Sequence, residues 1–256
     1  MSGLSLSLYA VPAIPLIQPG DDLAAIIFAA IEHSQLQLED DDIVVIAQKI
    51  ISKAENRIVD LETVTAGAEA LRIAQQADKD PGLVELILQE SNAVIRCKEG
   101  VIIVEHRSGI VMANAGIDHS NVGGPADKQL VTLLPEDANA SAAQLRQELQ
   151  QHSGKQLGVI INDSVGRAWR IGTVGIAIGS SGVLPLRDLR GEQDLFGEVL
   201  RVSETADADA LACAACLLMG EAADASPVII IRGHQLDQSG LDTTMLIRSK
   251  QDDMFR

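Results

Sequence analysis

The sequence has 256 residues, of which 46% are hydrophobic and only 2% aromatic, and its formal net charge is −16 at pH 7. It is long enough for one large domain or two interlocked lobes, with a core built mainly from aliphatic side chains. The scarcity of aromatic rings and the negative charge argue against a protein that binds nucleic acid. An anionic ligand would have to meet local Arg and Lys side chains or bound divalent ions.

Nothing in the sequence indicates a membrane or secreted protein. The first residues lack the basic start of a secretory signal, and no segment approaches the roughly 20 apolar residues of a membrane span. We therefore expect a cytoplasmic protein that contacts no membrane. Three cysteines, Cys97, Cys213 and Cys216, are too few for a disulfide framework, and the C-x-x-C pair lies in an Ala-rich run with no second pair to complete a zinc site.

Strand and helix patterns alternate through the first half of the chain. In order, we predict a strand at 4–10, a turn at 19–20, a helix from 21 or 22 to about 33, a strand at 43–47 leading into a polar segment, helices at 62–77 and 81–91, and strands at 92–97, 101–105 and 110–113.

The second half opens with a loop of small and polar residues at 114–128. We then predict a helix at about 141–152, strands at 157–162, 172–179 and 198–204, a helix at 206–219, a turn at 220–221, and a last strand at 228–232. Strands outnumber the helices between them and several are hairpin-linked, so the pattern predicts an α+β fold with mixed sheets rather than a regular doubly wound sheet. No composition shift marks a boundary, so we treat residues 1–256 as a single domain, with two interlocked lobes as the alternative.

Oxygen-bearing side chains follow several apolar stretches. Asp163 and Ser164 come directly after the apolar run Val159-Ile160-Ile161, Asp118 lies in the loop, and Glu221 follows the Ala-rich helix. Strand ends at a sheet edge are common ligand sites, and Mg²⁺ and Mn²⁺ take carboxylate, hydroxyl and phosphate oxygens. These residues are therefore candidate metal ligands, although turn and cap roles explain each of them singly.

Basic side chains are the notable positive points in this acidic chain. Lys53 follows a short apolar strand, and Arg167 and Arg170 follow Asp163; salt bridges on a solvated face are the alternative role. A fixed ammonium beside a metal-bound triphosphate stabilises charge during phosphoryl transfer, and Arg offers a planar fork to phosphate or carboxylate. The sequence contains neither a P-loop nor a G-x-G-x-x-G motif after a strand, so a bound nucleotide requires another scaffold.

Five blocks of sequence, in order, resemble the coenzyme F420-0:L-glutamate ligase family, also called F420 gamma-glutamyl ligase. The resemblance runs from about Val11 to Arg248. Its blocks are Ile51-Ser52-Lys53-Ala54-Glu55, Asn114-Ala115-Gly116-Ile117-Asp118 with Ser120-Asn121-Val122, Gly158-Val159-Ile160-Ile161 through Asp163 and Gly166-Arg167, Gly175-Ile176-Ala177-Ile178-Gly179 with Ser181-Gly182, and Leu218-Met219-Gly220-Glu221.

The resemblance implies a ligase that adds L-glutamate by gamma linkage to the lactyl-phosphate side chain of the deazaflavin coenzyme F420-0 and converts GTP to GDP and phosphate. It also implies two divalent ions, Mg²⁺ or Mn²⁺, a monovalent K⁺, and an intertwined homodimer with a fold of its own. Asp118 and Asp163 would hold one divalent ion, and Ser164 and Glu221 the other.

The resemblance further implies a set of guanine-nucleotide contacts. They are Ile14, Pro15, Leu16, Ile17, Gln48, Lys53, Asn121, Met219, Gly220, Glu221, Ala222, Ala223, Asp224, Ala225 and Ser226. Gln48 stands where archaeal members carry Ser, and Ser164 replaces a Thr but keeps the hydroxyl. The segment after Glu221 lacks the glycines of some relatives, which bears on close backbone approach to a phosphate.

A mechanism that needs no protein nucleophile fits these residues. The acceptor carboxylate would attack the γ-phosphate to give an acyl phosphate, which the glutamate amine then displaces. Lys53 and Arg167 are the candidate clamps for phosphate or carboxylate. Two alternatives stay open: a related amide ligase with another acceptor or amino acid, and a noncatalytic homodimer that binds GTP.

Overall fold

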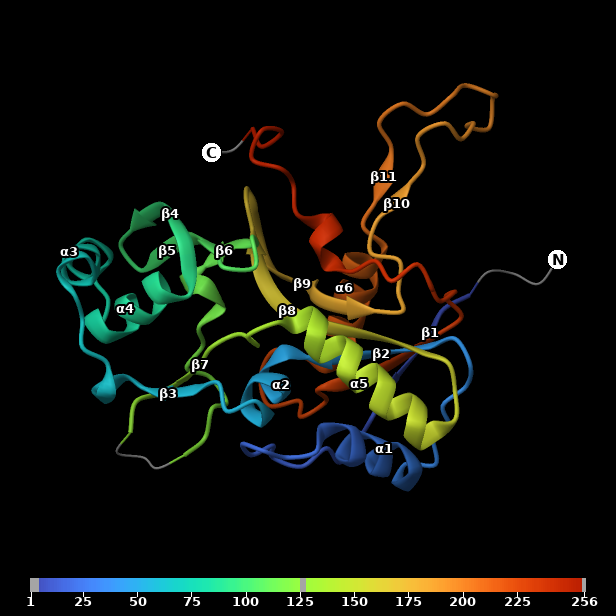
Figure 1. Ribbon diagram of the computed structural model, residues 1–256, viewed down its shortest axis with the longest axis horizontal. Coiled ribbons are helices and arrows are strands. Elements are labelled where there is room, and N and C mark those ends of the chain that lie inside the picture. Colours follow the sequence, from blue (N-terminus) through green and yellow to red (C-terminus); the bar gives the residue numbers. More distant parts are fainter. Residues whose placement is uncertain (1–4, 125–127, 255–256) are drawn as a thin grey trace.

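The computed structural model describes residues 5–124 and 128–254. Its principal sheet has five strands in the order β1-β12-β2-β8-β9 (Figure 1). These strands are β1 (Ser7–Ala10), β12 (Val228–Arg232), β2 (Asp42–Ala47), β8 (Leu157–Arg167) and β9 (Arg170–Ser181). Only β2 and β8 run parallel, and the other neighbouring pairs are antiparallel. The predicted mixed α+β class is confirmed.

Helices cover both faces of this sheet. Alternate residues of β2 face opposite ways: Val44 and Ile46 pack with α1 (Leu23–His33) and α5 (Ala138–Ser153), whereas Ile43 and Val45 pack with α6 (Asp207–Met219). Because both faces of β2 are covered, its sequence is a continuous apolar run instead of an alternating one. The central strands are thus held in place by two apolar layers, and the residues that follow them start from fixed positions.

A separate apolar cluster lies beside the sheet, around α3 (Ala68–Ala77) and α4 (Pro81–Gln89) (Figure 1). A three-stranded sheet of β4 (Ser91–Lys98), β5 (Val101–His106) and β6 (Val111–Ala113) packs on these helices. The short pair β3 (Ile58–Asp60) and β7 (Leu130–Thr132), with the 3₁₀ turns η1 (Leu61–Thr63) and η2 (Asn114–Gly116), joins this region to the main sheet. How many domains the chain has stays a prediction.

Several predicted elements differ from the structure. The polar segment after β2 is helix α2 (Gln48–Ala54), and only 68–77 of the predicted helix 62–77 is α-helical. The helix predicted from 141 begins at 138, because Asp137 caps it by accepting a hydrogen bond from Ala140 N at 3.0 Å. The first strand, predicted from Leu4, is described only from residue 5, and part of the predicted loop 114–128 also lies outside the described residues.

The predicted strand 198–204 is wrong. Residues 187–205 form an arm that projects from the body and is held at its base by the two-residue strands β10 (Arg187–Asp188) and β11 (Glu204–Thr205) (Figure 1). Its large apolar side chains are exposed, with Leu195 at 99%, Phe196 at 91% and Val202 at 85%. The two sides of the arm are joined by single backbone hydrogen bonds, such as Leu200 N to Glu192 O at 2.8 Å, and by one bridge between Gln193 and Val199, so only residue 204 of the predicted strand lies in a regular strand.

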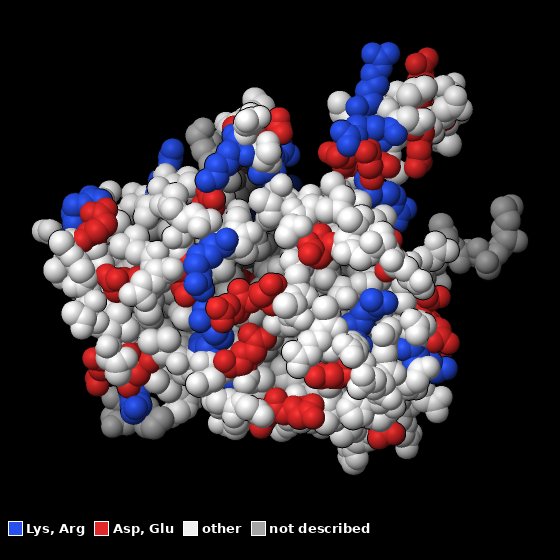
Figure 2. Space-filling model, viewed as in Figure 1, with Lys and Arg blue, Asp and Glu red and all other residues white. Residues whose placement is uncertain are grey.

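The described part of the chain contains no helix that is both long and apolar enough to cross a membrane. On the face shown in Figure 2, acidic and basic side chains lie next to one another and the basic ones do not gather into a single patch. Arg232, which is half-buried, also forms an ion pair with the buried carboxylate of Asp42, at 2.8 Å.

Candidate metal and nucleotide site

The candidate site lies where β2 ends. Ala47, the last residue of β2, pairs with Asn162 of β8, so Gln48 and Asp163 continue from the same level of two parallel strands. Ligands commonly bind at the carboxyl ends of such strands. Helix α2 begins at once after β2 and carries Lys49 and Lys53. Two chain segments far apart in sequence therefore present a carboxylate and two ammonium groups at one place.

Asp163 does not lie beyond the strand, as predicted, but within it. Strand β8 continues to Arg167, where Asp163 pairs with Ile176 of β9 and Ser164 with Gly175. Successive side chains of a strand point to opposite faces, so the Asp163 carboxylate and the Ser164 hydroxyl face opposite sides of the hairpin. The polar stretch 162–167 forms a strand because β9 supplies a partner for its backbone.

The surroundings of Asp163 raise its pKa to about 7. Burial is the largest cause, and the negative charges of Asp118 and Glu221 raise the pKa further, while the hydrogen bond from Ser164 N at 2.9 Å and the charge of Lys49 oppose the shift. Carboxylates from three separate segments thus lie close enough to affect one another. Such crowding of negative charge fits a bound cation with oxygen ligands.

Asp118 has a cationic partner within the chain. Its Oδ2 accepts hydrogen bonds from Lys49 Nζ at 2.7 Å and from Ser120 Oγ at 2.9 Å, and its Oδ1 accepts from Ser120 N at 2.7 Å. Burial alone would raise the pKa of Asp118, but the bonds from Lys49 and Ser120 outweigh it and lower the pKa. Lys49 is a functional candidate that local sequence does not single out, because its partner is 69 positions away.

Lys53 is buried and links two of the predicted nucleotide segments. Its Nζ donates to the backbone carbonyl of Asn121 at 2.6 Å, and Asn121 Nδ2 donates to the carbonyl of Ala222 at 3.3 Å. Burial, and then the charge of Lys49, lower the pKa of Lys53. The structure therefore brings together Lys53, Asn121 and the segment after α6.

The segment 219–226 folds back on itself. Helix α6 ends at Met219, and Gly220 follows with φ of +70°. Asp224 Oδ2 accepts from Ala222 N at 3.2 Å, and a Cβ on Gly220 would lie 2.0 Å from that oxygen. Glycine at 220 is thus required both by its φ and by the approach of Asp224. Other residues of this segment are Glu221 and Ala223, both exposed, Ala225 with φ of +53°, and Ser226, whose Oγ donates to Asp224 O at 3.3 Å.

The remaining predicted nucleotide contacts lie beside α2. Gln48 is buried, and its Oε1 accepts from Ser52 Oγ at 2.8 Å. Gly20 N donates to Ala54 O at 2.8 Å, which ties the segment before α1 to the end of α2. Within that segment Ile17 is buried in the core with Ile14 packed against the same cluster, whereas Pro15 and Leu16 are exposed.

Arg167 is not brought to the carboxylates. It lies at the exposed end of the β8–β9 hairpin, where its guanidinium donates to Ile171 O at 3.3 Å. Four residues of strand separate it from Asp163, which corresponds to about 13 Å. In the described chain no group of three or more His, Cys, Asp or Glu side chains is close enough to hold a metal ion. The predicted ligand sets have two protein ligands each, so phosphate and water oxygens would have to complete them.

Comparison with known proteins identifies the chain. The family model of F420-0:Gamma-glutamyl ligase matches residues 13–233. The proteins named Coenzyme F420:L-glutamate ligase from Methanothermobacter thermautotrophicus and Methanopyrus kandleri are 44% and 40% identical to it, over 99% and 100% of this chain and 100% of each relative. The protein of that name from Methanocaldococcus jannaschii is 43% identical over 87% of this chain and 88% of its own length.

These matches define the class of protein first: the chain is an enzyme of the ligase class. It belongs to the F420-0:gamma-glutamyl ligase family. The family resemblance predicted from the five sequence blocks is therefore confirmed. The individual site residues, the metals and the nucleotide stay predictions.

Proposed function

We propose that this protein is a GTP-dependent coenzyme F420-0:L-glutamate ligase, which joins L-glutamate by gamma linkage to F420-0 and releases GDP and phosphate. Its family and the names of its relatives support the substrates. The observation that carries the nucleotide part is geometric: β2 and β8 reach the same level at Ala47 and Asn162, which places Asp163 beside the start of α2, where Lys49 donates to Asp118 at 2.7 Å. Carboxylates crowded beside fixed ammonium groups suit a site for metal-bound phosphates.

The reaction proceeds through an activated carboxylate. A carboxylate oxygen of the acceptor attacks the γ-phosphorus of GTP, the bond to the bridging oxygen breaks, and GDP leaves. The amine of glutamate then attacks the acyl carbon, phosphate leaves, and the nitrogen loses a proton to form the amide. Such in-line transfer depends on positioning and charge stabilisation, so a protein nucleophile is not needed.

The metal ligands in this proposal are Asp118 and Asp163 for one Mg²⁺ or Mn²⁺, and Ser164 and Glu221 for the other. Their hard oxygen donors fit these ions, and a monovalent K⁺ belongs to the same site. When bound, the divalent ions offset the charge of the phosphates and the acceptor carboxylate. The opposite orientation of the Asp163 and Ser164 side chains supports the assignment of these neighbours to different ions.

The nucleotide would lie along α2 and the segment after α6. Lys53, held by its bond to Asn121 O, is positioned as a fixed positive charge for phosphate oxygens. Asn121 in turn bonds to Ala222, so the two segments that would hold the nucleotide are in direct contact. In this proposal Arg167 binds phosphate or carboxylate in the site of a partner subunit. It does not reach the site of its own chain, because four residues of strand separate it from Asp163.

A ligation assay tests the proposal. The purified protein is incubated with GTP, Mn²⁺, L-glutamate and F420-0, and mass spectrometry follows glutamyl additions to the acceptor. We expect additions that require GTP and are lost in Asp163→Asn. Additions to a different acceptor, or with a different amino acid, would indicate the related amide ligase instead. GTP binding without any turnover would indicate a noncatalytic protein.

A further inference from the structure

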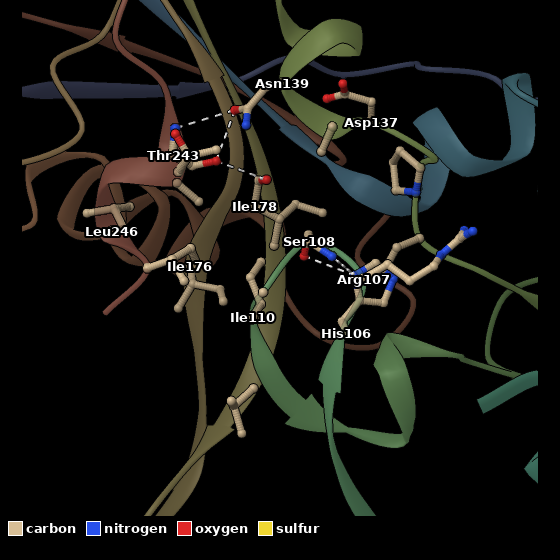
Figure 3. Close-up of a pocket in the computed structure, with 18 of the residues that line it drawn as sticks. His106, Arg107, Ser108, Ile110, Asp137, Asn139, Ile176, Ile178, Thr243 and Leu246 are labelled. Atoms are coloured by element: carbon tan, nitrogen blue, oxygen red, sulfur yellow. Dashed lines mark hydrogen bonds between the residues drawn. The ribbon is translucent and has the colours of Figure 1, made fainter. Parts of the chain in front are cut away.

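A cavity of about 670 Å³ lies on the α5 side of β9 (Figure 3). Its walls come from β9, from the loop between β5 and β6, from the start of α5, and from η3 (Thr243–Leu246) with the chain that follows it. This volume is typical of pockets for small molecules and cofactors. No residue of the candidate nucleotide or metal site lines it. The cavity is therefore available to a reactant other than GTP.

The cavity nevertheless adjoins the candidate metal site. Ile176, one of its lining residues, is the direct partner of Asp163 across the β8–β9 hairpin. Paired residues on antiparallel strands face the same side, with their Cβ atoms about 5 Å apart. Ile178 lines the same cavity two residues further along β9. A molecule lying along these isoleucines would thus have one end beside the Asp163 carboxylate.

The lining is apolar in the middle and polar at its ends. Ile110, Ile176, Ile178 and Leu246 supply apolar surface. At one end Asn139 Oδ1 accepts from Thr243 Oγ1 at 2.9 Å, and at the other lie His106, Arg107 and Ser108 (Figure 3). Arg248 also lines the cavity and is exposed. Four acidic residues line the cavity as well: Glu136, Asp137, Asp209 and Asp253. The apolar middle suits a large, partly apolar molecule, and the two arginines are the places for an anionic group.

We propose that this cavity binds the heterocycle of the deazaflavin acceptor, with its anionic tail running past Ile176 toward Asp163. The inference rests on the proposed function. Of the three reactants, GTP has its candidate contacts elsewhere, on α2 and after α6. Glutamate is small and highly charged, and the aliphatic walls offer it little. The acceptor alone combines an extended ring system with a terminal carboxylate that has to reach the metal-bound phosphate.

The test compares two neighbouring residues of η3. Leu246 lines the cavity, whereas Met245 does not line it and is 40% exposed. Leu246→Trp should fill the cavity and raise KM for F420-0 about tenfold or more, with KM for GTP and glutamate unchanged. Met245→Trp adds the same ring outside the cavity and should change none of these constants. Circular dichroism and the melting temperature of both variants report on folding.

A second pair of variants keeps the test decisive if Leu246→Trp fails to fold. Arg248→Gln removes a positive charge from the cavity, and Arg96→Gln removes one from the exposed face of β4. Only the first should raise KM for F420-0. An acceptor KM unchanged in Leu246→Trp and in Arg248→Gln, or a rise in KM for glutamate instead, overturns the cavity assignment. A wild-type protein that adds no glutamate to F420-0 defeats the proposed function itself, which is a separate result.

Discussion

Asp163 is the residue whose surroundings depart furthest from those of an ordinary surface carboxylate. It lies inside a strand, its pKa is raised to about 7, and two further carboxylates contribute to the shift. In the protein without metal, Asp163 is therefore harder to ionise than an exposed carboxylate. A divalent cation would remove this penalty, since it favours the ionised form.

The raised pKa gives a pH dependence of stability. Below about pH 4, Asp163 is protonated in both the folded and the unfolded chain; between about pH 4 and pH 7 only the folded chain keeps the proton. Stability of the metal-free protein should therefore fall as pH rises through this window, by up to about 4 kcal/mol, and then level off. Urea unfolding at several pH values measures it. Asp163→Asn should lose this component, and a pH profile identical to that of the wild type would contradict the assignment.

Lys53 gives a second prediction for a single residue. Lys53→Met keeps most of the length of the side chain but removes the ammonium group, so kcat/KM for GTP should fall by about 100-fold. Steady-state kinetics with varied GTP measures this loss. Lys53 also bonds to Asn121 O, so the melting temperature separates the two roles. A lowered melting temperature with normal kcat/KM would show that the residue acts only in the fold.

Helix α5 and strand β9 pack unusually closely. A Cβ on Gly179 would lie 2.3 Å from the backbone oxygen of Ala138, whereas one on Gly166 in the same hairpin would meet nothing within 4 Å. Gly179→Ala should therefore lower the free energy of unfolding by about 2 kcal/mol or more, and Gly166→Ala should be nearly neutral. Denaturant unfolding compares the two. Equal effects would mean that α5 can shift away from β9 at little cost.

The elements that sequence predicted best are those buried on a consistent pattern. The continuous apolar run at β2 is typical of a buried strand, and the Ala-rich run at α6 is typical of a helix. Both elements are found close to the predicted bounds. Helix α2 was missed because it has only seven residues and a mixed pattern. The continuation of β8 through 162–167 was missed because polar residues there pair with β9, which local sequence does not reveal.

The candidate site was predictable as a set of residues but not as an arrangement. Residue types singled out Asp118, Asp163 and Lys53, and the family resemblance linked them to one reaction. The pairing of Lys49 with Asp118 and the bond from Asn121 to Ala222 span 69 and 101 positions, so spacing alone carries no information about them. Arg167 is exposed because β8 extends to that residue in the β8–β9 hairpin, whereas the sequence pattern predicted a strand that ends at residue 162.

For the whole molecule, two projections carry exposed apolar side chains. The arm presents Leu195 and Phe196, and the end of the β8–β9 hairpin presents Trp169 at 82% and Ile171 at 101% exposure. Large exposed apolar groups on projecting segments mark interaction sites. We propose that they take part in the intertwined homodimer that the family resemblance implies, in which the projections of one chain would pack on its partner.

Phe196→Asp tests that assembly. The charge would oppose burial of the arm, so the variant should elute as a monomer while the wild type elutes as a dimer in size-exclusion chromatography with light scattering. Leu217→Asp, at an 85% exposed position on α6, serves as the matched control and should leave the dimer intact. A monomeric wild type, or a dimer insensitive to Phe196→Asp, would remove the arm from the assembly.

The proposed ligation depends on separate segments of the chain meeting to bind divalent ions that hold a nucleotide. The most direct measurement is a Mn²⁺ titration, followed by electron paramagnetic resonance, in the presence of a nonhydrolysable GTP analogue. We predict that the wild type binds two Mn²⁺ per chain and that Asp163→Asn loses at least one, while Asp78→Asn, the same change at an exposed helix end, binds as the wild type does. Equal Mn²⁺ binding by the wild type and Asp163→Asn would contradict the account.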